Sequence, residues 1–150
     1  MGQEKTNKFT KIILDVMFYC GVGILATLPF TLRLAGRYYS KALSDNFISM
    51  LLVFAVAGVC GLMIVAQLRR MMKTVIEGAC FVPDNVRSLQ VMANLSLVIA
   101  AAFIIKLFLV PTPATAVIVL VFFIAALFSQ VLANVFAEAI RYKEETDLTI

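Results

Sequence analysis

Few residues in the chain have side chains suited to chemistry. There is no His, and the three cysteines, Cys20, Cys60 and Cys80, form no paired Cys motif. A zinc site would need a set of Cys and His ligands, so none is expected. Ser129 could act as a nucleophile only beside a base, and the sequence offers no evident one. We therefore expect neither an enzyme nor a bound cofactor or metal.

The polar residues inside apolar stretches are the next candidates for a site. Asp15 follows Lys11 by four residues, a spacing that allows an ion pair on one helix face. Lys106 lies near one end of an apolar stretch, where its long side chain is expected to reach the headgroups. Together with Asp15, four amides could form a hydrogen-bonded layer between helices: Gln67, Asn94, Gln130 and Asn134. Such a layer would fix helix register, or alternatively line a cavity for a small molecule or lipid.

The composition identifies the solvent that these residues face. Of the 150 residues, 62% are hydrophobic and only 15% are charged, whereas soluble domains average roughly 25% charged. The charges leave four uncharged windows, at residues 16–32, 46–68, 88–105 and 107–137. A membrane-spanning helix needs roughly 20 apolar residues, and helices satisfy their own backbone groups in lipid. We predict one all-α membrane domain over residues 1–150, with four transmembrane helices.

The predicted segments have approximate limits. The spans cover residues 12–34, 46–68, 88–110 and 113–137, with Pro111 and Pro113 setting the start of the last one. A hairpin tip covers residues 69–87, and a C-terminal tail covers residues 138–150. Small residues recur on the spans and allow either internal packing or a homo-oligomer face: Ala125, Ser129, Ala133 and Ala137, and Ala57 with Gly61.

The basic residues predict the orientation, because Lys and Arg near the spans favour the cytoplasmic side. Most of them flank the termini and the second connection, which favours an N-in, C-in topology. These are Lys5, Lys8, Lys11, Arg69, Arg70, Lys73, Arg87, Arg141 and Lys143. Arg33, Arg37, Lys41 and Lys106 fall on the opposite side. The net charge of +4 is then explained by anionic lipid headgroups, without direct nucleic-acid binding.

The stretch "IEGACFVPDNVRSLQ", residues 76–90, is expected to form the end of a helical hairpin. The second spanning helix should continue past the membrane and stop at Gly78 with a left-handed cap. Asp84 or Asn85 could cap the third helix, or Pro83 could be its first residue. The fourth helix should also continue, to about residue 145. The final "KEETDLTI" could fold against the hairpin, offer a peptide to a partner, or fray.

Two motifs, "IEGACFVPDNVRSL" and "YKEETDLTI", resemble a bacterial family of four-span membrane proteins. That family is catalogued as domain of unknown function number two thousand nine hundred and seventy-five. The family-like residues are Gly78, Phe81, Asn85, Arg87, Leu89, Asp147, Leu148, Thr149 and Ile150. The resemblance implies a multi-pass protein of the bacterial cytoplasmic membrane. It also suggests a small helix-turn-helix regulator as a candidate partner.

Because the unusual sequence clusters on the predicted cytoplasmic side, we expect a non-enzymatic regulatory or protein-interaction module. Its surface would consist of the hairpin at residues 76–90 and the C-terminal tail. The alternative is a small-molecule or lipid binder associated with transport. Four short spans without a deep charge argue against an independent secondary transporter.

Overall fold

The computed structural model describes residues 2–38 and 41–149, with only the backbone for residues 42, 43 and 149. The described residues form helices and no strand. In chain order the helices are α1 (Gly2–Ala26), α2 (Leu28–Tyr38), α3 (Lys41–Asp45), α4 (Phe47–Ile76), α5 (Pro83–Leu109) and α6 (Pro113–Thr149). Four of them, α1, α4, α5 and α6, are long and apolar enough to cross a membrane. The predicted all-α fold with four spanning helices is confirmed.

Two of the prolines at helix boundaries are Pro113 and Pro29. Pro113 is the first residue of α6, as predicted, and the hydroxyl of Thr112 accepts a hydrogen bond from the Thr115 N–H at 3.3 Å. The first span was predicted as one helix but breaks between α1 and α2. Pro29 has no N–H to donate, and its ring disfavours a regular helix over the preceding turn. Next to the break, the Thr27 hydroxyl bonds back to the carbonyl of Gly23 at 3.0 Å.

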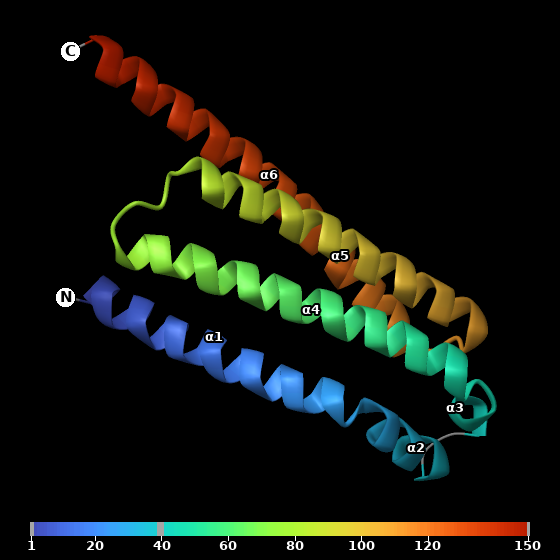
Figure 1. Cartoon of the computed structure of the whole chain (residues 1–150). Helices are drawn as coiled ribbons and strands as arrows, with labels where there is room; N and C mark the ends of the chain where they lie inside the picture. The colour runs from blue at the N-terminus through green and yellow to red at the C-terminus, as the bar shows by residue number, and fades with distance from the viewer. Residues whose placement is uncertain (1, 39–40, 150) are drawn as a thin grey trace.

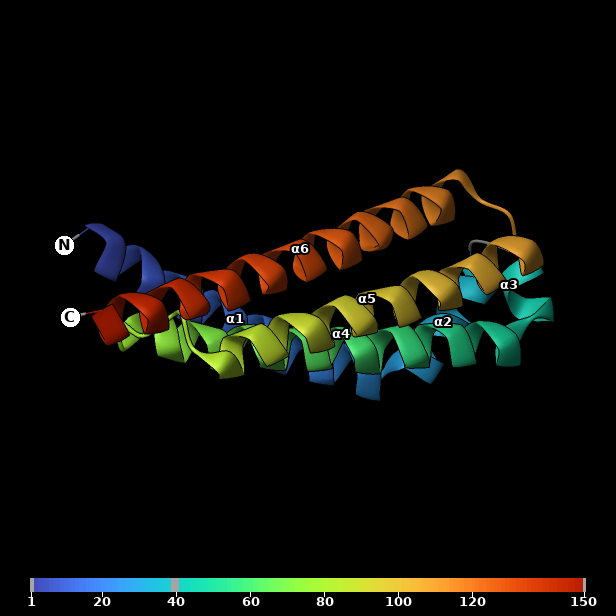
Figure 2. The same cartoon turned by 90° about the horizontal axis from the view of Figure 1, so that it is seen from above.

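The four long helices pack as neighbours in chain order. The backbone of α1 contacts that of α4, α4 contacts α5, and α5 contacts α6, whereas over the described residues α1 and α6 are not in backbone contact. Figures 1 and 2 show them running along a common direction. The start of α1, the α4–α5 turn and the end of α6 lie at one end of the molecule, called here the termini end (Figure 1). The α5–α6 connection, α2 and α3 lie at the other end, called the far end.

The core lies mainly along α5, which contributes residues to two buried clusters. One cluster contains Cys60, Ile99 and Phe103, and the other contains Leu89, Met92 and Ala133. Ser129 is also buried, so Ser129 and Ala133 of the predicted small-residue stripe serve packing inside the chain. The Ala137 end of the stripe is exposed.

Candidate functional site

The α4–α5 turn begins with a helix cap at Gly78. This glycine has φ +80°, a left-handed conformation that residues with a Cβ rarely adopt. Its N–H bonds to the carbonyl of Val75 at 3.1 Å, and the next N–H, from Ala79, bonds to the carbonyl of Thr74 at 3.0 Å. This pair of bonds is the Schellman motif, which satisfies carbonyls at a helix C-terminus. The predicted left-handed cap at Gly78 is confirmed.

Asn85 holds the two sides of the turn together. Its side-chain amide donates to the Thr74 hydroxyl at 2.7 Å and to the Cys80 carbonyl at 2.6 Å. The Thr74 hydroxyl in turn donates to the carbonyl of Met71 at 2.7 Å. Asn85 is only 2% exposed. Burying an amide is costly unless its polar atoms are bonded, so this network favours one geometry of the turn.

The same bonds correct the prediction that Asp84 or Asn85 caps α5. Pro83 is the first residue of α5, as the alternative had it, and the residue before it, Val82, makes no side-chain cap bond. A cap residue would accept a hydrogen bond from a free N–H of its own helix. Asn85 instead lies inside the first turn of α5 and donates to groups on α4 and the connection. Its role is to join two helices rather than to begin one.

The turn is also attached to α6. The ring of Phe81 packs edge-to-face against the ring of Phe136, with centroids 5.1 Å apart. Leu89 is 3% exposed and shares a cluster with Ala133 of α6 and Met71 of α4. The amphipathic ends of α4 and α5 therefore pack face to face, as predicted, and α6 supports them.

The C-terminal motif lies apart from this cluster. α6 stays helical through Thr149, and its side chains from residue 141 to 148 are exposed, with Leu148 87% exposed. Of the three alternatives for the tail, the fold-back on the hairpin is wrong over residues 141–148, because the helix continues past the turn (Figure 1). Asp147 and Leu148 lie on this projecting helix, the side chain of Thr149 is not described, and Ile150 lies outside the described residues. Arg87 is exposed on α5.

Asp15 has a partner on another helix. Its carboxylate accepts a hydrogen bond from Arg69 Nε at 2.7 Å, and both side chains are about one-third exposed. The Arg69 guanidinium also lies over the ring of Phe18, 4.8 Å from its centroid. This cluster links α1 to α4. The sequence analysis used Arg69 only to predict the orientation. A signal for the pair was present, because Asp15 and Arg69 each border an apolar window at the termini end.

The four predicted amides occupy different surroundings. Gln130 and Asn134 lie exposed on α6, where the Gln130 amide donates to Asn134 Oδ1 at 3.4 Å. Asn94 is exposed on α5, and Gln67 is half-buried on α4. The structure thus brings together Asp15 with Arg69 and Gln130 with Asn134. A layer that joins all five predicted residues stays a prediction.

Lys106 lies at the far end. The prediction that its side chain reaches outward to the headgroups is wrong. The lysine is 8% exposed, and its ammonium donates to the Thr115 hydroxyl at 2.6 Å. The Thr115 hydroxyl is also 2.6 Å from the hydroxyl of Thr112. The Thr115 hydroxyl thus gives the buried ammonium an oxygen partner that the sequence pattern did not reveal.

The chain matches a known protein family. The family described as "Protein of unknown function (DUF2975)" matches residues 14–150, which includes both motifs. The comparisons with curated proteins and with solved structures found no match.

Proposed function

The chain belongs to the DUF2975 family of proteins of unknown function, and we propose that it is a non-enzymatic membrane module that presents a protein-interaction surface to the cytoplasm. The surface consists of the α4–α5 turn with the start of α5, residues 76–90, and the projecting end of α6, residues 138–150. We place the protein in the bacterial cytoplasmic membrane with both termini inside. A small helix-turn-helix regulator is a candidate partner.

The observation that carries this proposal is the exposed extension of α6. A helix rises about 1.5 Å per residue, so the 37 residues of α6 extend about 55 Å. A hydrocarbon core of about 30 Å leaves a substantial part of this helix in water at the termini end. Two contacts of this part lie within the helix itself: an ion pair of Arg141 with Glu138 at 3.7 Å, and a hydrogen bond from the Thr146 hydroxyl to the Tyr142 carbonyl at 2.9 Å.

The extension presents apolar groups among its charges. Tyr142 is 68% exposed and Leu148 is 87% exposed. A short helix without packing contacts gains little stability in water, so a surface that covers these side chains would stabilise it. Exposed aromatic and aliphatic groups beside charged ones are typical of helices that dock into a groove.

The α4–α5 turn supplies a second part of the surface, with a more restricted conformation. Asn85 and Gly78 favour one backbone geometry, and Phe81, although packed on Phe136, remains 45% exposed. A preformed loop with an exposed aromatic ring loses little conformational entropy on binding. The turn and the α6 extension lie at the same end of the molecule (Figure 1).

The topology is tested by thiol labelling in whole cells. In a Cys20→Ser, Cys60→Ser background, Cys80 should react with a membrane-impermeant reagent only after the cells are permeabilised. A matched control adds Ala114→Cys to Cys80→Ser in that background, and this far-end thiol should react in intact cells. Labelling of Cys80 in intact cells would place the turn outside and remove the proposed surface from the cytoplasm.

The interaction is tested by affinity capture from gently solubilised membranes. A cytosolic protein retained by the intact chain should be lost when residues 147–150 are deleted or when Tyr142→Ala and Leu148→Ala are combined. Phe108→Ala is the matched control, because Phe108 is 85% exposed but lies in the last turn of α5, at the far end. If all variants retain the same proteins as the intact chain, the α6 extension is not the binding surface.

A further inference from the structure

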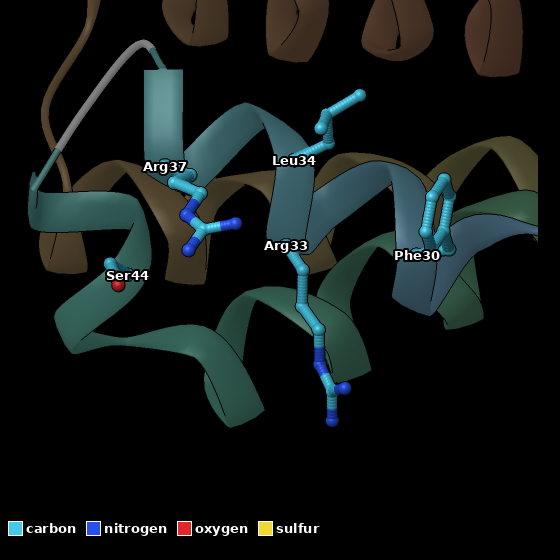
Figure 3. Close-up of a pocket in the computed structure, with 5 residues that line it drawn as sticks. All are labelled: Phe30, Arg33, Leu34, Arg37 and Ser44. Atoms are coloured by element: carbon cyan, nitrogen blue, oxygen red, sulfur yellow. The ribbon is translucent and has the colours of Figure 1, made fainter.

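A pocket of about 440 Å³ lies at the far end, away from the surface proposed above. It is lined by Phe30, Arg33, Leu34, Arg37 and Ser44 (Figure 3). The first four residues belong to α2 and Ser44 belongs to α3. The lining therefore combines two cations and a hydroxyl with an aromatic and an aliphatic side chain.

The two arginines are placed for one shared ligand. Arg33 and Arg37 are one helical turn apart and extend to the same side of α2 (Figure 3). Arg33 is held over the ring of Phe47, 5.5 Å from its centroid. Within residues 2–38 and 41–149, neither guanidinium forms a salt bridge with a carboxylate. Their hydrogen-bond donors thus remain available to an anion.

α3 brings the hydroxyl to this site by packing closely against α2. A Cβ placed on Gly36 would be 3.5 Å from the Cα of Ser44, which is ordinary van der Waals contact. Ser44 is exposed, so its hydroxyl is accessible beside Arg37. The pocket thus joins two helical segments that the first connection brings together.

The position of the pocket across the membrane matches the layer of lipid headgroups. Lys11 is the last basic residue before the apolar part of α1, and Arg33 follows it by 22 positions, which is about 33 Å along α1 and α2 at the helical rise. This length is close to the roughly 30 Å thickness of the hydrocarbon core. If Lys11 lies at one membrane surface, Arg33 lies at the other, among lipid phosphates.

The charge pattern needs an explanation that the pocket supplies. Basic residues near spans favour the cytoplasmic side, and Arg33 and Arg37 oppose that bias if the termini are inside. Orientation therefore gives no reason for arginine at these positions. An anionic ligand at the pocket gives one.

We propose that this pocket binds the phosphate headgroup of an anionic phospholipid in the leaflet opposite the two termini. The planar guanidinium of arginine can form two parallel hydrogen bonds with phosphate oxygens, and the Ser44 hydroxyl can donate a further one. Phe30 is 72% exposed and Leu34 is 48% exposed. These apolar side chains beside the cations favour an amphiphile, with acyl chains near the headgroup, over a free inorganic anion.

The test is native mass spectrometry of the full-length protein in detergent with added phosphatidylglycerol or phosphatidylcholine of the same acyl chains. The protein should retain phosphatidylglycerol at least about tenfold more tightly than phosphatidylcholine. The double variant Arg33→Gln, Arg37→Gln should lose about tenfold or more in affinity for phosphatidylglycerol. Equal retention of the two lipids, or an unchanged affinity in this variant, would overturn the proposal.

Two further variants separate a specific site from general charge and from misfolding. Arg141→Gln with Lys143→Gln removes the same charge at the termini end and should leave the affinity unchanged; an equal loss would show non-specific attraction and refute the site. Arg33→Lys with Arg37→Lys keeps the charge and should fold, yet bind more weakly because the paired hydrogen bonds are lost. Parent-like affinity in this lysine variant would contradict the proposed contacts.

Inorganic phosphate distinguishes the two sources of the ligand. Added at the concentration of the lipid, it should not displace phosphatidylglycerol from the intact protein. Displacement at equal concentration would show that the pocket takes a soluble phosphate group, and the assignment to a lipid would be wrong.

Discussion

Replacing Asn85 with alanine tests whether the α4–α5 turn is held by side-chain hydrogen bonds. The substitution removes the two bonds to the Thr74 hydroxyl and the Cys80 carbonyl, at 2.7 and 2.6 Å. It leaves the backbone of α5 intact, because alanine is a good helix former. The turn should therefore open more often, while the four long helices stay in place.

The magnitude follows from these two bonds. A neutral hydrogen bond contributes roughly 0.5–1.5 kcal/mol net, and leaving a buried partner unsatisfied costs about 1–3 kcal/mol. Water can reach part of this turn, since Cys80 is only half-buried and Gly78 is exposed. We therefore expect the free energy of local opening to fall by about 2 kcal/mol, which corresponds to a roughly 30-fold increase in the open population.

Backbone hydrogen exchange reads out this opening directly. The N–H groups of Gly78 and Ala79 are protected by bonds to α4 carbonyls, and local opening exposes them to solvent. In the Asn85→Ala variant their exchange should become roughly 30-fold faster. Arg87→Ala, an exposed position on the same helix, is the control and should change the exchange by less than about threefold.

Two outcomes would refute this reasoning. If Gly78 and Ala79 exchange at the parent rate in Asn85→Ala, the amide does not hold the turn. If amides in the middle of α5 accelerate equally, Asn85 stabilises the whole bundle rather than the turn.

Three further predictions concern other contacts. In Phe136→Ala the loss of the edge-to-face contact should weaken the attachment of the turn by about 0.5–1.5 kcal/mol, seen as faster exchange near residue 81 and absent in Phe128→Ala on an exposed face of α6. A double-mutant cycle of Asp15→Asn and Arg69→Gln should give a coupling of about 1 kcal/mol or less, because both side chains are one-third exposed; thermal unfolding measures it, and zero coupling would deny the pair. Thr115→Val should lower the free energy of unfolding by about 1–3 kcal/mol, because the Lys106 ammonium loses the hydroxyl that accepts its hydrogen bond. Thr115→Ser should restore the stability in thermal unfolding, and parent stability in the valine variant would contradict the role of this bond.

Features read from consecutive residues were predictable. The uncharged windows predict the four long helices, because transfer into lipid depends mainly on local composition. Gly78 predicts the left-handed cap at the C-terminus of α4, since glycine adopts positive φ at little steric cost. Pro113 predicts the start of α6, because proline suits a first turn. Pro29 lies inside the predicted span 12–34, and the break next to it differs from the single helix predicted there.

Features that depend on two distant segments were not predictable in detail. Asn85 was named as a candidate from its position, yet its partners Thr74 and Cys80 became clear only in the structure. Arg69 was missed as the partner of Asp15 because it is 54 residues away in sequence, although the two side chains are hydrogen-bonded in the structure. The outward orientation predicted for Lys106 is wrong, because its sequence neighbours give no sign of the Thr115 hydroxyl that accepts its hydrogen bond.

The sequence by itself determined the number of spanning helices, the place of the turn and the cap that ends α4, since each follows from hydrophobicity or backbone preference within one segment. Only the tertiary structure decided that Asn85 joins α4 to α5, that Phe81 rests on α6, and that Arg33, Arg37 and Ser44 line one pocket. The physical reason is that these contacts depend on the rotation and depth of each helix relative to its neighbours. Those are set by side-chain packing between segments, which no single window of the chain contains.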